Sequence, residues 1–379
     1  MSDFVNTPPA PPEHGHPPLH GRVGVVLVNL GTPDGTDYWS MRRYLKEFLS
    51  DPRVIEVPRV IWWFILNLII LTFRPTKSGH AYASIWDREH NASPLRVITR
   101  AQAEALQKRF RNQEPRNQGT KGEEADTVVV DYAMRYGQPS IAAVMDRMMA
   151  AGCTRVLVAP LYPQYSAATV ATVVDKLGEW MGKQRWQPTV RVLPPYYDHP
   201  AYIGALTESV RSKLASLDWQ PDVIVASLHG LPLVNCKRGD VYYCHSHKTV
   251  RLLAEGLGSA FVKEVGDLQG VVSKGKKAGI PPVLLAFQSR FGAQEWLKPY
   301  FAKATVDLAA AGHKKVLVIC PGFAADCVET LEEIAIAGRE EFMHAGGTHY
   351  DVVACLNASD TGMDMLEGLV EMELMGWVE

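Results

Sequence analysis

The sequence predicts an α/β fold made of two similar Rossmann-like units, each a four-stranded parallel sheet flanked by helices. Short runs of apolar, β-branched residues alternate with helical patterns along most of the 379 residues, an order typical of parallel α/β sheets. The runs are continuously apolar, which indicates strands buried on both faces. A nine-residue segment recurs in the second half of the chain, which favours two related units.

Each predicted element follows from this alternation. We expect strands at residues 24–30, 127–132, 155–159, 189–193, 222–227, 283–287, 315–320 and 350–354. We expect helices between them at residues 140–151, 167–181, 202–214, 249–257, 298–311 and 327–344.

The repeated segment is AAGCTRVLV at residues 150–158 and AAGHKKVLV at residues 310–318, identical at six of nine positions. Both copies are followed by a proline and a helical pattern. We therefore predict a unit at residues 22–195 and a second at 196–355, with the functional site in a cleft between them. Residues 1–21 are predicted to be a disordered tail, and residues 356–379 a C-terminal tail or helix.

Composition excludes several classes of function. The net charge is -2 and the isoelectric point about 6.6, whereas a nucleic-acid-binding protein would show a basic stripe. Neither GxGxxG nor GxxxxGK[ST] occurs, so no nucleotide is expected. The six cysteines are scattered without a CxxC pair, which favours a reducing compartment. The Pro- and His-rich start has no apolar core of a signal peptide. A cytoplasmic protein is predicted.

One segment, VIWWFILNLIILTF at residues 60–73, is almost wholly apolar. Its 14 residues fall short of the roughly 20 that span a bilayer. Arg59 precedes the segment, and Arg74 and Lys77 follow it. One interpretation is a buried core helix; the other is an exposed apolar lip that contacts a membrane surface or a large flat ligand.

His229 lies in SLHGLP, directly after the apolar strand pattern at 222–227. Ligands of open parallel sheets bind beyond the carboxyl ends of the strands, and Gly230 and Pro232 favour a tight turn that holds the imidazole. A histidine there can act as a base, a proton shuttle or a metal ligand. The alternative is a structural histidine that bonds the backbone at a strand end.

A second group of polar residues lies in PGFAADCVETLEEI, residues 321–334. Asp326 and Glu329 fit a capping box at the start of a helix. Glu329 and Glu333 are four residues apart, so they share a helix face, and aligned carboxylates attract cations. The capping box leaves Glu333 unexplained, which favours a functional acidic face.

Two further groups of residues are weaker candidates. Arg135 and Tyr136 follow the strand at 127–132, and Arg135 can grip a carboxylate or be a surface arginine. Cys236 and Cys244, with His245 and His247 nearby, match no standard zinc spacing, so ordinary loop residues are favoured.

At these residues the chain resembles the ferrochelatases, enzymes that insert ferrous iron into a porphyrin. The motifs are VVLVNLGTPD, MRYGQPS, LYPQYSAAT, SLHGLP, FQSRFGAQEWLKPY and GFAADCVETLEEI. They occur in family order between about residues 23 and 357. The resemblance implies the chelatase-type fold and the formation of protohaem from protoporphyrin IX.

The resemblance also implies residue roles. His229 takes a pyrrole proton, coordinates the incoming metal, or both; Glu329 faces it, and Asp326 and Glu333 continue an acidic path. The apolar run belongs to an active-site lip at residues 54–94. The porphyrin-binding positions are Leu30, Tyr82, Arg135, Tyr136, Trp296 and Phe323. The positions expected to contact the inner membrane are Trp62, Trp63, Phe64 and Ile65.

Cofactors and partners follow in the same way. Ferrous iron and a porphyrin are substrates, and no cofactor, nucleotide or nucleic acid is expected. Ala167 stands where animal members carry a cluster cysteine, and Cys327 stands where some members carry a histidine. We predict no [2Fe-2S] cluster, with Cys236 and Cys244 as its only candidates. A monomer is expected.

Three alternatives remain open at this stage. The chain could be a chelatase for another tetrapyrrole or metal, such as coproporphyrin or cobalt. It could be a haem or porphyrin carrier without turnover, but such a carrier has no use for three carboxylates. A structural protein of the membrane surface would explain only the apolar run.

Overall fold

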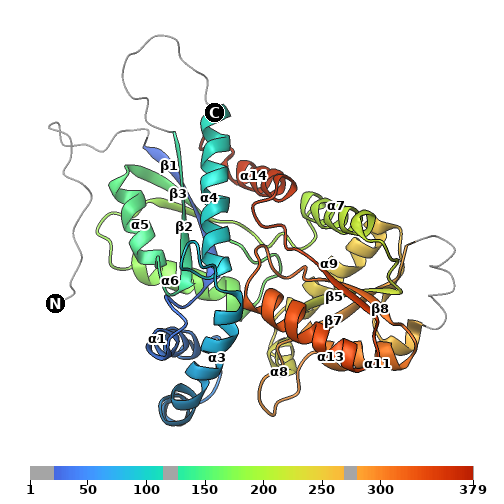
Figure 1. Cartoon of the computed structure of the whole chain (residues 1–379). Coiled ribbons are helices and arrows are strands. Elements are labelled where there is room, and N and C mark those ends of the chain that lie inside the picture. The colour runs from blue at the N-terminus through green and yellow to red at the C-terminus, as the bar shows by residue number, and fades with distance from the viewer. Residues whose placement is uncertain (1–20, 114–126, 269–279, 379) are drawn as a thin grey trace, which may run out of the picture.

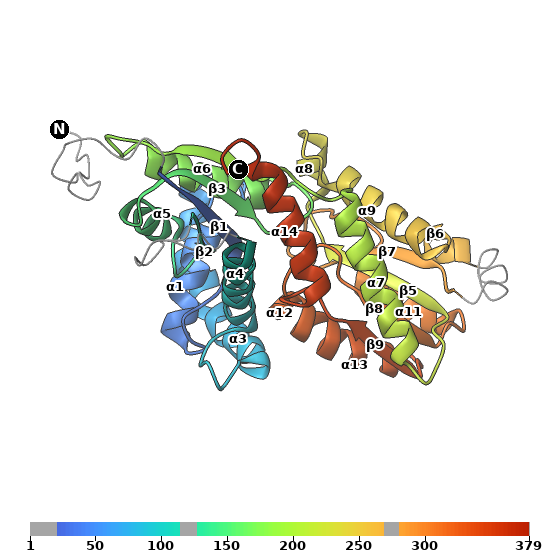
Figure 2. The same cartoon turned by 90° about the horizontal axis from the view of Figure 1, so that it is seen from above.

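The computed structural model describes residues 21–113, 127–268 and 280–378. Of the predicted N-terminal tail, residues 1–21, only Gly21 therefore lies within the described residues. Within them the chain forms two parallel sheets flanked by helices, as predicted, and Figures 1 and 2 show them on the two sides of the molecule.

The first sheet has four parallel strands in the order β2-β1-β3-β4. In β1 the side chains alternate between two cores: Val26 and Val28 pack with helices on one face, and Val25 and Leu27 pack on the other. The strands are β1 (Arg22–Gly31), β2 (Val128–Tyr136), β3 (Cys153–Pro160) and β4 (Thr189–Val192). Its helices are α4 (Pro94–Gln113), α5 (Ile141–Ala150), the π-helix η2 (Ala167–Ala171) and α6 (Thr172–Met181).

The second sheet is also parallel, with the order β6-β7-β5-β8-β9. Its strands are β5 (Val223–His229), β6 (Phe261–Val262), β7 (Val283–Gln288), β8 (Lys315–Ile319) and β9 (His349–Val353). The helices before β7 are α7 (Pro200–Ser216), α8 (Leu233–Lys237), α9 (Tyr242–Leu257) and the short η3 (Val265–Asp267). The later helices are α11 (Phe301–Ala310), α12 (Val328–Thr330), the π-helix η4 (Leu331–Gly338) and α13 (Arg339–His344).

The prediction of four strands was wrong for the second sheet, which has a fifth, β6. Two residues are too few to leave a pattern in the sequence. Without β6, the order β7-β5-β8-β9 repeats the order β2-β1-β3-β4. In the two repeated segments a glycine with positive φ precedes the equivalent strands β3 and β8: Gly152 (φ 81°) and Gly312 (φ 89°). A positive φ favours glycine, so both copies keep it.

The two sheets share one buried core. A single cluster of buried apolar side chains includes Leu27 of β1 and Ile224 of β5. The C-terminal helix α14 (Asp360–Leu374) lies between the units and packs on α4, α7 and β3 (Figure 2). The boundary at residues 195/196 stays a prediction, because no gap in the core marks it.

The apolar segment is part of a longer helical stretch than its own 14 residues. Helix α1 (Tyr38–Leu49) packs against it. The stretch runs from Arg59 to Ile85 and is the one helix, within the described parts of the chain, that is long and apolar enough to cross a membrane. It consists of α2 (Arg59–Phe64), the π-helix η1 (Ile65–Ile70) and α3 (Leu71–Ile85).

This stretch is fastened to the protein along one face. Pro75 lacks an N–H, so the carbonyl of Leu71, four residues earlier, has no helical donor. The Tyr38 hydroxyl donates to that carbonyl at 2.9 Å. The indole of Trp62 donates to the Leu49 carbonyl at 2.7 Å. The helix therefore lies along the body of the protein, at the lower edge of the view in Figure 1.

Candidate functional site

His229 is the last residue of β5, at the carboxyl end of the second sheet. Its Nδ1 lies 2.6 Å from the Gly230 carbonyl oxygen. Because a carbonyl only accepts, Nδ1 carries a proton, and in the neutral ring Nε2 keeps its lone pair. Within the described residues Nε2 has no hydrogen-bond partner. The strand end thus presents a base or metal ligand.

The turn after His229 is packed without spare room. The Gly230 N–H donates to the Gln288 carbonyl at 2.8 Å. A Cβ on Gly230 would lie 2.7 Å from that carbonyl oxygen and 2.9 Å from Cε3 of Trp296. The Trp296 ring centroid is 6.5 Å from that of His229. The structure therefore places these two predicted site residues side by side.

The acidic segment begins differently from the prediction. The N-cap residue is Cys327, and its capping box is completed by Thr330 rather than by Asp326 and Glu329. The buried Asp326 accepts from the Thr330 hydroxyl at 2.9 Å and from the Asn357 side-chain amide at 2.6 Å. Asp326 thus anchors the turn to the chain before α14. Its predicted part in an acidic path stays a prediction.

Glu329 and Glu333 have different surroundings. The Glu333 carboxylate accepts from the backbone N–H of Ser289 at 2.7 Å and from its hydroxyl. Glu329 acts electrostatically on two phenols instead: burial, followed by the charge of Glu329, raises the pKa of Tyr82 well above its usual value. Burial, the neighbouring Tyr82 and Glu329 do the same to the pKa of Tyr44.

An apolar wall adjoins Glu329. Leu30 from the end of β1 and Phe323 pack against a small cluster that contains Cys327. Leu30 also packs against the cluster that holds Tyr82. Of the predicted porphyrin-binding residues, Leu30, Tyr82 and Phe323 therefore gather near the acidic segment.

Arg135 does not join this wall, whereas Tyr136 belongs to the same buried cluster as Tyr82. Arg135 is 5% exposed; its Nε donates to the Thr172 carbonyl at 2.8 Å, and it forms a buried ion pair with Asp51. The Tyr136 hydroxyl donates to the same carboxylate at 3.0 Å. The interpretation of Arg135 as a grip for a ligand carboxylate is therefore wrong, because Asp51 holds it. Arg135 instead lines a cavity of about 220 Å³ beside α5 and α6.

The predicted lip divides into two faces. Trp62 is 7% exposed and belongs to the core, so its assignment to the membrane face was wrong. Trp63 and Phe64 are 57% and 53% exposed, and Ile65 is partly buried against the core. The exposed apolar side chains of this face are Val60, Ile61, Trp63, Phe64, Leu68, Ile69 and Phe73.

Arg74 is a residue that the sequence reasoning missed. Its guanidinium stacks on the Phe291 ring, 4.7 Å from the centroid, and burial lowers its pKa. In the described parts of the chain it has no ion pair. A desolvated cation without a carboxylate favours an anionic ligand. The available signal was an arginine at the end of an apolar run.

The two cluster candidates lie near each other but offer few ligands. Burial, with smaller effects of Asp240 and Cys244, raises the pKa of Cys236, and Cys244 is exposed. Within the described residues no group of three or more His, Cys, Asp or Glu side chains is placed to hold a metal.

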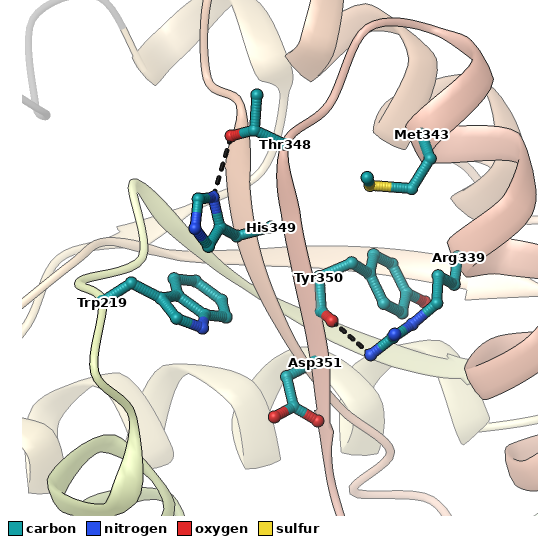
Figure 3. A pocket seen from close by; sticks show the side chains of 7 residues that line it. All are labelled: Trp219, Arg339, Met343, Thr348, His349, Tyr350 and Asp351. Atoms are coloured by element: carbon teal, nitrogen blue, oxygen red, sulfur yellow. Dashed lines mark hydrogen bonds between the residues drawn. The ribbon is translucent and has the colours of Figure 1, made fainter.

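A separate cavity of about 290 Å³ lies beside β9, away from the predicted site residues (Figure 3). Its polar groups are paired: Arg339 donates to the Tyr350 carbonyl at 2.6 Å, and Asp351 pairs with Lys213 at 2.8 Å. The cavity therefore offers no free charge to a ligand.

Comparisons with known proteins agree on one family. The family model described as Ferrochelatase matches residues 22–374. A relative named Ferrochelatase from Agrobacterium fabrum is 49% identical, with 94% of this chain and 95% of the relative covered. Ferrochelatases of Allorhizobium ampelinum and Rhizobium meliloti are each 48% identical; the alignments cover 100% of both chains for the first, and 96% of this chain and 98% of the relative for the second.

Solved structures resemble the chain more distantly. The SirB protein from Bacillus subtilis with Fe³⁺ has a TM-score of 0.49 and 9% identity, covering 92% of this chain and 94% of that chain. CbiX is described as the terminal enzyme for biosynthesis of siroheme in denitrifying bacteria. It has a TM-score of 0.42 and 12% identity, and the match covers 93% of this chain and 98% of that chain.

Proposed function

The chain belongs to the ferrochelatase family, and on that premise we propose that it inserts ferrous iron into protoporphyrin IX to form protohaem, with His229 and Glu329 at the reacting centre. The observation that carries the assignment is the Nδ1 contact of His229 with the Gly230 carbonyl. It leaves Nε2 as a base at the end of β5, in a network that also reaches Glu329.

The chemistry requires a base and an anion together. A free-base porphyrin releases two N–H protons as one divalent cation enters. The lone pair of His229 Nε2 can accept one of these protons, the second is released to water, and the carboxylate of Glu329 attracts the cation. No electron is transferred, so the reaction needs no redox cofactor.

The surrounding residues suit a flat, largely apolar substrate that carries carboxylates. Leu30, Phe323 and Trp296 supply apolar and aromatic surface beside the acidic segment and His229, and the buried Tyr82 belongs to the cluster on which Leu30 packs. Arg74, desolvated and without an ion pair in the described residues, is suited to pair with a porphyrin carboxylate. Tyr136 packs in the same buried cluster as Tyr82, and Asp51 holds both Tyr136 and Arg135.

Anaerobic metal insertion tests this function. Purified protein is mixed with protoporphyrin IX and Fe²⁺, and separately Zn²⁺, while metalloporphyrin absorbance is followed. We expect turnover in the wild type and a loss of at least about a hundredfold in His229→Ala, the scale of general-base catalysis. The exposed His344→Ala serves as the matched control. Tight porphyrin binding without turnover would support a carrier, and turnover only with coproporphyrin or Co²⁺ would support the alternative chelatases.

We also propose that the protein is cytoplasmic and that its lip contacts the inner membrane. The support is the row of exposed apolar side chains on one face of the helix from Arg59 to Ile85, while its other face is fixed to the core. A helix so fastened lies in the plane of a membrane surface and does not cross it.

Liposome flotation tests the membrane contact. We expect Trp63→Glu/Phe64→Glu to remove most of the flotation of the wild type, because two charges would enter the apolar face. Trp186→Glu/Met375→Glu replaces exposed apolar residues outside the lip and should float like the wild type. Equal flotation of all three proteins would end the membrane proposal.

We propose finally that the protein binds no iron–sulfur cluster. Cys236 and Cys244 lack two further ligands among the described residues, whereas a [2Fe-2S] cluster needs four. Protein purified under anaerobic conditions should lack iron–sulfur absorption. Stoichiometric iron and sulfide that disappear in Cys236→Ser would contradict this.

A further inference from the structure

Gln288 ends β7 beside His229 in the sheet, and Ser289 follows it. The parallel strands β5 and β7 pair His229 with Gln288. The Gln288 carbonyl accepts from the Gly230 N–H at 2.8 Å, and its side-chain Oε1 accepts from the Ser227 hydroxyl at 2.8 Å. Gln288 is thus bonded to β5 on both sides of the histidine.

The side-chain nitrogen of Gln288 reaches the acidic segment instead. Nε2 donates to the backbone carbonyl of Glu329 at 2.7 Å and lies 3.4 Å from the Glu333 carboxylate. The residue is 3% exposed. A buried amide bonded at both ends sets the spacing of the two elements that it joins.

Ser289 bonds to the acidic segment at Glu333, one helical turn after Glu329. Its N–H donates to Glu333 Oε1 at 2.7 Å, and its hydroxyl donates to Oε2. Ser289 has φ 63°, in the left-handed region that non-glycine residues seldom adopt. Such a conformation persists where the surroundings over-determine it, and here both donors of Ser289 meet one carboxylate.

The helix that carries Glu333 is a π-helix, η4, and is secured on its other side as well. The Tyr350 hydroxyl donates to the Ile334 carbonyl at 2.7 Å. Figure 3 shows Tyr350 on β9 with the Arg339 guanidinium at its carbonyl. A π-helix is a rare, locally widened turn, so its position depends on such external bonds.

We propose that Gln288 and Ser289 are positioning residues that hold the metal-attracting Glu329 in register with His229, and that Glu333 is the anchor through which Ser289 acts. The inference rests on the proposed function, since it assigns a task to residues around the same centre. It gives Glu333 a role different from a step in an open acidic path.

A double-mutant cycle of Ser289 and Glu333 tests this. Ser289→Gly removes the hydroxyl but keeps the N–H and permits φ 63°. Glu333→Gln keeps the side-chain length and one acceptor oxygen, and it replaces the other oxygen and the charge with an amide donor. We expect Ser289→Gly to lower kcat about tenfold, the scale of one hydrogen bond to a charged group, with the KM for porphyrin unchanged. The double variant should be no slower than Glu333→Gln alone, because both changes break one contact.

The matched control is Ser216→Gly, which removes the hydroxyl of an exposed serine at the end of α7. It should keep the wild-type kcat. Additive losses in the double variant, or a wild-type kcat in Ser289→Gly, would overturn the positioning role while the wild type still turns over. No turnover in the wild type would instead remove the proposed function.

Hydrogen exchange supplies a second measurement that does not need turnover. In Ser289→Gly, peptides covering residues 329–340 should exchange faster than in the wild type, while peptides covering 349–353 stay unchanged. Unchanged exchange at 329–340 would overturn the anchor, whatever the activity.

Discussion

At the scale of single residues, the pair of Arg135 and Asp51 shows how a polar group becomes structural. Both side chains are almost fully buried, and Tyr136 and the Thr172 carbonyl complete their hydrogen bonds. Removing one partner of such a pair leaves an unpaired buried charge.

Asp51→Ala should therefore destabilise the protein by about 3–5 kcal/mol. Urea denaturation followed by circular dichroism measures this. Arg53→Ala, which breaks a largely exposed pair with Asp175, should cost less than about 1 kcal/mol. Similar losses in the two variants would contradict the structural role of the buried pair.

His247 makes stability depend on pH. Burial, helped by Lys263, lowers its pKa from 6.5 to about 4, and its Nε2 has no hydrogen-bond partner among the residues that the structure describes. Below pH 6.5 the unfolded chain binds the proton and the folded chain does not, so stability falls as the pH drops from about 6.5 to about 4.

His247→Phe should make the urea midpoint depend less on pH between about 6.5 and about 4, because phenylalanine cannot bind the proton. The exposed His344→Phe is the control, and its urea midpoint should change with pH as much as that of the wild type. If the urea midpoint of His247→Phe changes with pH as in the wild type, other groups cause the pH dependence of stability.

At the scale of elements, the helix from Arg59 to Ile85 has two faces with opposite roles. Adjacent tryptophans fall on different faces: Trp62 packs in the core, and Trp63 is exposed. Polar side chains bond to backbone carbonyls in and next to the π-helix η1. Asn67 donates to the Trp63 carbonyl at 2.8 Å, and Thr72 donates to the Leu68 carbonyl at 3.0 Å.

Trp62→Ala should lower the free energy of unfolding by about 3–5 kcal/mol, because it removes a large buried side chain. Trp63→Ala should change it by less than about 0.5 kcal/mol. Chemical denaturation of both variants compares them directly. Equal losses would mean that the helix does not lie on the protein as described.

At the scale of the whole molecule, one core joins both sheets, and α14 packs on elements of each. Two units that share a core should unfold together. The C-terminal segment, predicted as a tail or helix, is thus part of the fold and not an appendage.

Calorimetry should show a single transition, and Leu366→Ala on the buried face of α14 should lower its Tm without splitting it. The expected cost is about 2–5 kcal/mol. Met372→Ala, on the exposed face of the same helix, should leave the Tm near that of the wild type. Two separate transitions would contradict the shared core.

Sequence patterns alone predict the parallel α/β class, eight of the strands and the position of His229 at a strand end. These properties are local: a continuous apolar run forms a buried strand, and the residue after it lies at the carboxyl edge of the sheet. The repeat at residues 150–158 and 310–318 likewise marked two strands that the fold makes equivalent.

Which polar residues face one another follows from the packing of separate elements. Arg135 pairs with Asp51, 84 residues away, and Gln288 links His229 to a helix 41 residues later. Sequence spacing carries no record of such partners, because they meet only when separate elements pack. The same packing placed Trp62 inside and Trp63 outside, and made Cys327 the N-cap in place of Asp326.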